Sequence, residues 1–303
     1  MKAYYTDHFV LPLPPGHRFP MEKYRLLRDL VACHPDIELI EPAAATNQDL
    51  FRAHDVEYIE AVTQGRLTDA QIREIGFPWS EAMVERSRRS AGATIAACLS
   101  ALKEGVAVNL AGGTHHAYAD KGSGFCVFND AAVAARYVQS MSPTRVAVID
   151  LDVHQGNGTA AILGKDSSCF TLSLHGEKNF PFRKEDSHLD VGLPDDCGDG
   201  EYLKILQQAL MELEQRFTPE LIIYLAGADP HEGDRLGRLK LTMQGMEQRD
   251  RLVLGFAREL QCPIAIAMAG GYGRTIKTTV DVHHQTIQLA LQYHQQIQPK
   301  VHQ

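Results

Sequence analysis

Five short apolar runs, each ending in polar residues, constrain the fold of this chain more than any other feature. Because the runs do not alternate between apolar and polar residues, they predict strands buried on both faces, as in a parallel sheet. The five runs are Val106–Leu110, Arg145–Leu151, Cys169–Leu174, Leu221–Ala226 and Ile264–Ala269. Helical patterns lie between them, at Ser80–Leu102, Asn129–Ser140, Tyr202–Phe217 and Thr242–Leu260. This alternation predicts a doubly wound α/β fold, with a mostly parallel central sheet flanked by helices.

The carboxyl ends of these runs carry titratable side chains. AGGTHH follows the first run, DLDVH spans the end of the second, and His175-Gly176 follows the third. GADP follows the fourth run and GGYG the fifth. In an open parallel sheet the carboxyl ends of the strands form the edge where ligands bind. A polar strand end is ordinary by itself, but five at one edge indicate a functional site.

A metal site is the first hypothesis for this edge. Side chains two residues apart in a strand point the same way, so Asp150, Asp152 and His154 can share one side. Carboxylate and imidazole both suit Zn²⁺. Asp229 would be the third ligand, which leaves one coordination position open, as in catalytic zinc sites. Taken alone, the first motif is equally consistent with a capped strand end, and Asp229 before a proline is usually a turn.

Two further motifs carry candidate catalytic groups. His115 and His116 follow two glycines, which allow the backbone to approach a ligand closely. Histidine titrates near neutral pH, so it can serve as a base and then as an acid. Tyr272 lies in a glycine-rich turn, where its hydroxyl could stabilise an oxyanion. A lone histidine or a turn tyrosine is more often structural, so these roles depend on the motifs occurring together.

Composition excludes several other classes. The net charge is −8 and no block of Lys and Arg occurs, which argues against sequence-independent nucleic-acid binding. An acidic chain is compatible with a cationic substrate. The six cysteines are scattered, which indicates free thiols. The sequence has no signal peptide, no apolar run long enough for a membrane span, and no linker or repeat. We therefore expect one catalytic domain over residues 1–303 and a cytoplasmic location.

The motifs together resemble the zinc-dependent histone deacetylase family, which has the arginase/deacetylase fold. They are GGTHHA at 112–117, GFCVFND at 124–130, DLDVHQGNG at 150–158, GADP at 227–230 and GGYG at 270–273. HQGNG, HRFPMEKY at 17–24 and GFPWS at 76–80 look closer to the class IV deacetylases and their bacterial relatives than to class I. The resemblance spans most of the chain.

The resemblance implies a role for each site residue. The implied zinc ligands are Asp152, His154 and Asp229. The implied catalytic residues are His116 as general base and acid, His115 as a second, electrostatic histidine, Asp150 as its orienting carboxylate, and Tyr272 as the oxyanion donor. Asn157 would partner His116 where class I enzymes have an aspartate. Loss of that negative charge favours the neutral imidazole, which suits a base.

The resemblance also implies a substrate tunnel and a second cation. Gly124, Phe125 and Phe180 would line a tunnel for the acyl-lysine side chain. A potassium ion is implied near Asp150, Asp152, His154, Ser173 and Leu174. Glu81 is a candidate for the acidic residue that grips the substrate backbone.

The expected activity is hydrolysis of lysine side-chain amides by metal-activated water, with an acetyl or longer fatty acyl group released. The partner would be an acylated lysine in a protein or peptide. The alternative is a small-molecule deacetylase, such as an acetylpolyamine amidohydrolase. A binding module without turnover is disfavoured because the catalytic side chains are all present. A binuclear manganese ureohydrolase is disfavoured because Gly156 stands where a second aspartate is needed.

Overall fold

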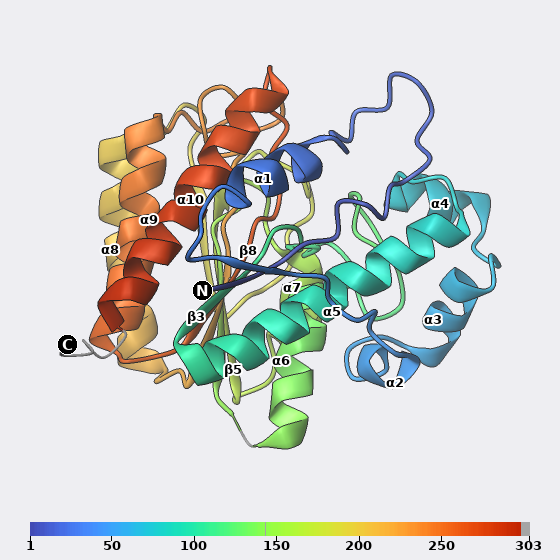
Figure 1. Ribbon diagram of the computed structural model, residues 1–303, viewed down its shortest axis with the longest axis horizontal. Helices are drawn as coiled ribbons and strands as arrows, with labels where there is room; N and C mark the ends of the chain where they lie inside the picture. The colour runs from blue at the N-terminus through green and yellow to red at the C-terminus, as the bar shows by residue number, and fades with distance from the viewer. Residues whose placement is uncertain (143, 298–303) are drawn as a thin grey trace.

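The computed structural model describes residues 1–142 and 144–297, and within them eight strands form one sheet (Figure 1). The order across the sheet is β2-β1-β3-β8-β7-β4-β5-β6, and every neighbouring pair is parallel. The strands are β1 (Lys2–Tyr4), β2 (Glu38–Ile40), β3 (Val106–Asn109), β4 (Val146–Asp150), β5 (Cys169–Gly176), β6 (Leu189–Leu193), β7 (Leu221–Leu225) and β8 (Ile264–Ala267). The parallel α/β fold predicted above is confirmed.

Helices cover both faces of the sheet. They are α1 (Lys23–Val31), α2 (Asn47–Leu50), α3 (Val56–Thr63), α4 (Asp69–Ile75), α5 (Glu81–Glu104), α6 (Asp130–Met141), α7 (Asn157–Leu163), α8 (Asp199–Arg216), α9 (Met243–Glu259) and α10 (Ile276–Ile297). Figure 1 shows α8, α9 and α10 on one face and α5 and α6 on the other. The short helices α2 to α4 lie beyond α5, on the side away from α8 to α10.

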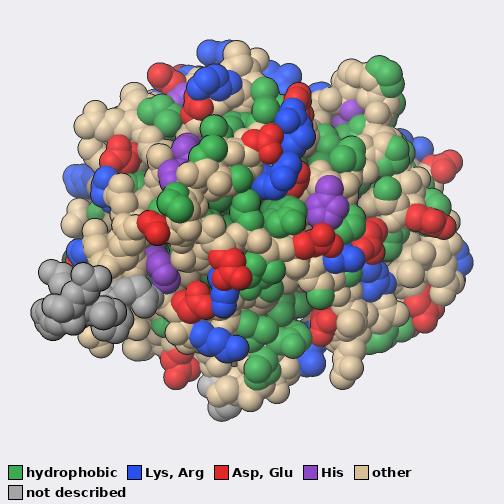
Figure 2. Space-filling view, viewed as in Figure 1, with side chains coloured by type: hydrophobic (Ala, Val, Ile, Leu, Met, Phe, Trp, Pro, Cys, Tyr) green, Lys and Arg blue, Asp and Glu red, His purple; other side chains and the backbone are tan. Residues whose placement is uncertain are grey.

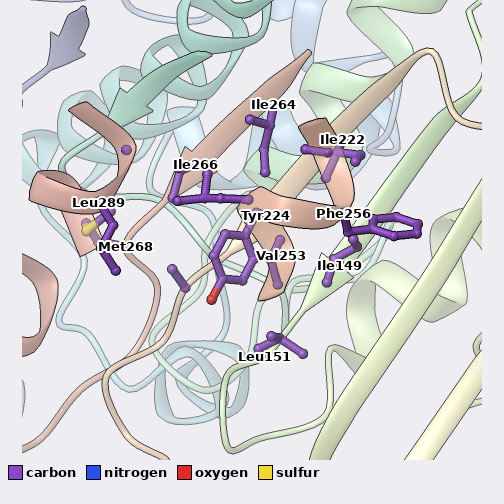
Figure 3. Packing of buried hydrophobic residues seen from close by; sticks show 14 of the residues in the cluster. Ile149, Leu151, Ile222, Tyr224, Val253, Phe256, Ile264, Ile266, Met268 and Leu289 are labelled. Carbon is purple, nitrogen blue, oxygen red and sulfur yellow. The ribbon is translucent and has the colours of Figure 1, made fainter. Parts of the chain in front are cut away.

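Successive residues of the central strands point into two separate cores. In β7, Ile222 and Tyr224 belong to the core beneath α8 to α10, whereas Leu221 and Ile223 belong to the core beneath α5 and α6. Figure 3 shows the first core, where side chains from β4, β7 and β8 pack with others from α9 and α10. Burying one such side chain contributes about 1.5–3 kcal/mol. Burial on both faces explains why the strands are apolar throughout.

All five predicted strands and all four predicted helices are present, with ends shifted by a few residues. Ser80, Asn129 and Thr242 prove to be the N-cap residues of α5, α6 and α9, and each side chain accepts a hydrogen bond from the third residue of its helix. The sequence reasoning missed three short strands (β1, β2 and β6), α1 to α4, α7 and the long helix α10. The polar and β-branched composition of α10 hides its apolar stripe.

The parallel topology positions the functional loops. The segments that follow β3, β4, β5, β7 and β8 all leave the sheet at its carboxyl edge, which is the predicted ligand-binding edge. Among the described residues, no helix is long and apolar enough to cross a membrane.

Candidate active site

A cavity of about 1450 Å³ opens at this edge, and most of the predicted site residues line it. Those that line it are His115, His116, Gly124, Phe125, Asp152, His154, Asn157, Phe180 and Tyr272. Asp150 and Asp229 lie behind this lining, and both are buried. The structure therefore brings every predicted catalytic, tunnel and metal-binding residue to one place.

Asp152, His154 and Asp229 form a group suited to hold a metal ion. One potential ligand atom from each residue lies within 4.8 Å of the others. His154 Nδ1 is 2.9 Å from Asp152 Oδ1 and 3.3 Å from Asp229 Oδ2. Asp229 Oδ2 is buried and accepts no hydrogen bond from any described residue, which is costly for a carboxylate without a cation. Two carboxylates and an imidazole fit a divalent metal with an open position.

Backbone amides orient both carboxylates. The amide of Val153 donates to Asp229 Oδ1 at 2.8 Å, and the amide of Gly270 donates to Asp152 Oδ2 at 2.8 Å. A Cβ atom at position 270 would lie 2.3 Å from Asp229 Oδ2 and 2.4 Å from Asp152 Oδ2. Only glycine therefore fits where the loop after β8 meets the loops after β4 and β7.

The charges of this group also call for a cation. Burial and the neighbouring Asp152 carboxylate raise the pKa of Asp229. Burial by itself would lower the pKa of His154, but contacts with Asp152 and Asp229 outweigh it and raise that pKa to about 10. Both pKa shifts arise because two buried carboxylates share the positive charge of one imidazole. A divalent ion would supply the missing positive charge directly.

Arg249 on α9 supports the loops that carry the two carboxylates. Its side chain is fully buried. Its Nη1 donates to the carbonyl oxygen of Gly227 at 2.6 Å and to that of Leu151 at 3.4 Å. Sequence reasoning missed Arg249, because only the tertiary fold places α9 behind the loops after β4 and β7.

His115 pairs with a buried carboxylate. Its Nδ1 lies 2.6 Å from Asp150 Oδ2, while Asp150 Oδ1 accepts the amide hydrogen of Asp152 at 3.1 Å. Burial lowers the pKa of His115, but the charges of Asp150 and Asp152 outweigh it and raise that pKa to about 9. The Asp150 contact matches the orienting partner expected from the sequence.

His116 pairs instead with a neutral amide. Its Nδ1 lies 2.6 Å from Asn157 Oδ1, and Asn157 Nδ2 donates to the hydroxyl of Tyr118 at 2.9 Å. The second contact sets the orientation of the amide, so His116 Nδ1 carries the hydrogen and Nε2 keeps a free lone pair. Burial, together with the neighbouring His115 and His154, lowers the pKa of His116 well below its usual value. His116 is therefore the neutral histidine of the tandem pair.

Tyr118 was not anticipated from the sequence. It receives the Asn157 hydrogen bond and donates its own hydrogen to Glu185 Oε1 at 3.2 Å. A chain of hydrogen bonds thus runs from His116 through Asn157 and Tyr118 to Glu185, which also lines the cavity. Tyr118 directly follows the GGTHHA motif at 112–117, and nothing in the sequence indicated that its hydroxyl would contact Asn157.

Tyr272 lines the same cavity, in the turn after β8. Its backbone amide donates to Asp234 Oδ2 at 2.6 Å, which fixes the turn after β8. Its ring packs near Phe125, with centroids 6.0 Å apart, and near Phe19 at 6.5 Å. Burial raises the pKa of Tyr272 well above its usual value, so the hydroxyl keeps its hydrogen and can donate it.

Aromatic rings form the walls of the cavity next to His116. The Phe180 ring meets the His116 ring edge to face at 4.9 Å. Gly124 and Phe125 both have positive φ angles, of 53° and 66°, and a Cβ on Gly124 would lie 2.7 Å from His116 Cδ2. Gly124 and Phe180 therefore lie against His116, and Phe125 lines the same cavity next to Tyr272. Glu81, at the start of α5, is exposed and does not line the cavity.

Comparison with known proteins gives a consistent picture. The model of the histone deacetylase domain matches residues 17–287. An uncharacterised protein of Picosynechococcus sp. is 43% identical over 284 residues, which cover 92% of this chain and 94% of that protein. Histone deacetylase 2 of Arabidopsis thaliana is 35% identical and matches 77% of this chain and 63% of its own length. A histone deacetylase-like amidohydrolase of Pseudomonas aeruginosa is 31% identical, with 86% and 74% covered.

The fold has solved counterparts as well. A crystal structure of a histone deacetylase homologue from Aquifex aeolicus superposes with a TM-score of 0.82 at 25% identity. The superposition covers 95% of this chain and 83% of that one.

Proposed function

Because this chain belongs to the histone deacetylase family and is a deacetylase-type hydrolase, we propose that it removes acetyl or longer fatty acyl groups from lysine side-chain amides with one bound zinc ion. The observation that carries the proposal is the convergence of three ligand atoms beside His116 in one cavity. An acylated lysine in a protein or peptide would be the substrate.

Asp152, His154 and Asp229 would hold the zinc ion. When bound, zinc supplies Lewis-acid activation of water and of the amide carbonyl. Iron(II) prefers similar ligands, so metal analysis belongs with every activity measurement. A binuclear ureohydrolase site is disfavoured, because a Cβ on Gly156 would lie 2.3 Å from Asp150 Oδ2, leaving no room for a second aspartate.

His116 would move the proton. Its free Nε2 accepts a hydrogen from the attacking water as the new C–O bond forms. The same nitrogen then gives that hydrogen to the lysine nitrogen as the C–N bond breaks. The hydrogen bond from Nδ1 to neutral Asn157 holds the ring in the required tautomer without adding a negative charge. This arrangement supports the class IV-like assignment, which stays a proposal.

Other residues would position the reacting atoms. His115, held by Asp150, would place positive charge beside the developing oxyanion, and the Tyr272 hydroxyl would donate to that oxyanion. Gly124, Phe125 and Phe180 would enclose the apolar stem of the lysine and exclude water. Asp150 is in register with Ser173 on β5, which supports a potassium ion near Asp150, Asp152, His154, Ser173 and Leu174.

An acyl-length series tests this function. One lysine peptide acylated with groups from acetyl to myristoyl would be offered to protein of measured zinc content. We expect zinc-dependent release of at least one acyl group, and loss of that release in a His116→Ala variant that still binds zinc. Normal turnover by His116→Ala, or no hydrolysis of any peptide by the zinc-loaded protein, would contradict the proposal.

A further inference from the structure

The mouth of the cavity carries a charge opposite in sign to the chain as a whole. The lining contains eight Lys or Arg and four Asp or Glu, whereas the chain has 30 and 38. The face drawn in Figure 2 shows acidic and basic side chains interspersed, with no broad area of one sign. The excess of positive charge is therefore a local property of the cavity.

Three arginines at the mouth have no carboxylate partner. Arg18 precedes α1, Arg73 lies in the last turn of α4, and Arg183 lies between β5 and β6. All three are exposed, and none forms an ion pair with any residue of the described ranges. Three separate segments thus contribute guanidinium groups to one opening.

The remaining charges of the mouth do not cancel these arginines. Lys121 pairs with Glu74 at 2.8 Å. Lys178 and Arg238 share Asp195, which lies just outside the lining, at 3.7 Å and 3.0 Å. The lining carboxylates that lack a cationic partner in the described part of the chain are Asp120 and Glu185, and the latter accepts the Tyr118 hydrogen bond. Even with Asp195 included, positive charges at the mouth exceed negative ones.

Apolar surface lies among these cations. Phe182, next to Arg183, has 87% of its surface exposed, and Phe180 and Leu236 are partly exposed on the same lining. Exposed aromatic groups interleaved with arginines are typical of surfaces that bind protein segments.

We propose that the mouth selects acyl-lysines that lie in acidic segments of proteins. The inference rests on the proposed function and names its substrate class. Acylated polyamines and lysine-rich segments are cationic, so the arginines would repel them. Arginine also suits a carboxylate-rich partner because its guanidinium can bind carboxylates through two hydrogen bonds. Each exposed pair changes affinity by about two- to fivefold, and salt screens the effect.

Three acetyl-lysine peptides test the proposal. They differ only in four flanking positions, filled with Glu, Gln or Lys. With zinc-loaded protein at low ionic strength, we expect kcat/KM to fall in the order Glu, Gln, Lys, with about a tenfold span or more between the extremes. At about 0.5 M salt the span should contract strongly. Equal rates, or a preference for the Lys peptide, would overturn the proposal.

Charge reversal tests whether the three unpaired arginines cause the preference among the peptides. A triple variant, Arg18→Glu with Arg73→Glu and Arg183→Glu, should invert the ratio of kcat/KM between the Glu and Lys peptides. The matched control is Lys165→Glu, because Lys165 is exposed just before β5, at the opposite edge of the sheet. Its ratio should equal that of the unmodified protein. An unchanged ratio in the triple variant would refute the assignment to these arginines.

Binding measurements separate this inference from the proposed function. If no acyl peptide is hydrolysed, the function fails, but fluorescence anisotropy of the same labelled peptides still tests the mouth. Tighter binding of the Glu peptide than of the Lys peptide would support it, and equal or reversed affinities would refute it. A single-stranded oligonucleotide that bound more tightly than the Glu peptide would overturn the proposal in favour of nucleic acid.

Discussion

Two buried polar clusters of this protein differ in whether their charges are balanced by the chain itself. The first is the Asp250 cluster, in which Asp250 accepts hydrogen bonds from Tyr224 at 2.5 Å, Thr286 at 2.5 Å and Arg249 Nε at 2.9 Å. The second is the metal-binding group after β4 and β7, in which Asp229 Oδ2 has no hydrogen-bond donor within residues 1–142 and 144–297. The first is closed within the core, and the second borders the cavity.

The contrast shows where a ligand is needed. In the Asp250 cluster the carboxylate meets a guanidinium and two hydroxyls, so its buried charge is compensated. In the metal-binding group two carboxylates meet one imidazole, so the compensation is incomplete. Arg249 contributes to both regions, because it pairs with Asp250 at 2.8 Å and donates to Gly227 in the loop that carries Asp229. A balanced cluster stabilises the fold, whereas an unbalanced one indicates a bound cation.

The largest effect is expected from Asp229→Asn. The amide keeps the shape and the hydrogen bond from Val153, but it removes one charge from the metal-binding group. We expect loss of bound zinc and about a thousandfold or greater fall in kcat/KM, since metal activation is worth several kcal/mol. In the presence of a chelator the variant should be as stable as the unmodified protein or more so, because repulsion with Asp152 is relieved. Unchanged zinc content, measured by atomic absorption, would contradict the inference that the uncompensated carboxylates bind the cation.

Asp250→Ala should have the opposite effect, because it should lower the stability and leave the zinc content unchanged. Removal of Asp250 leaves the Arg249 guanidinium buried without its partner, which costs about 3–5 kcal/mol of unfolding free energy. Zinc stoichiometry of the folded fraction should stay near one, because all three proposed ligands remain. Urea unfolding measures the change, and Glu212→Ala is the control. The exposed ion pair between Glu212 and Arg216 should contribute about 0.5 kcal/mol or less to the free energy of unfolding. An Asp250→Ala effect as small as the control would show that the closed cluster is not stabilising.

Tyr272→Phe tests the chemical step without changing either the metal-binding group or the Asp250 cluster. It removes only a hydroxyl that lines the cavity, so zinc content and stability should be preserved. The loss of one oxyanion donor should lower kcat by about 10²- to 10³-fold. Steady-state kinetics on the best substrate of the acyl-length series measures this. A variant with normal kcat would remove Tyr272 from the mechanism.

His54 should show a smaller, pH-dependent effect, because both of its ring nitrogens are already used. Nδ1 contacts the carbonyl of Tyr118, and Nε2 accepts from the amide of Asn129. Burial lowers the pKa of His54 to about 4. The unfolded chain therefore binds more protons between pH 4 and 6.5, so this contribution to stability is complete above pH 6.5 and is lost as the pH falls.

The expected size of this effect is about 2 kcal/mol between pH 7 and pH 5. Denaturant titrations at both values would measure it, and a His54→Gln variant should show a correspondingly smaller drop. If the drop is the same in both proteins, the His54 ring is not the group responsible.

Much of the candidate active site could be predicted from local patterns. The spacing of Asp150, Asp152 and His154 after an apolar run placed them at the carboxyl edge of a sheet, and the structure has them there. The tandem histidines and Tyr272 were assigned to the same edge for the same reason. The strands β1, β2 and β6 were missed because none is an unbroken apolar run: β1 and β2 have three residues each, and β6 alternates half-buried and exposed positions.

The sequence by itself determined the five central strands, the four helices between them and the chemistry at the strand ends, because a buried parallel strand has a recognisable pattern and its end meets the other ends at one edge. Only the tertiary structure decided that Arg249 supports the metal-binding loops, that Tyr118 accepts a hydrogen bond from the Asn157 amide beside His116, and that Arg18, Arg73 and Arg183 surround one opening. Those contacts join residues from separate segments, and charge balance in a cavity depends on which side chains meet in space.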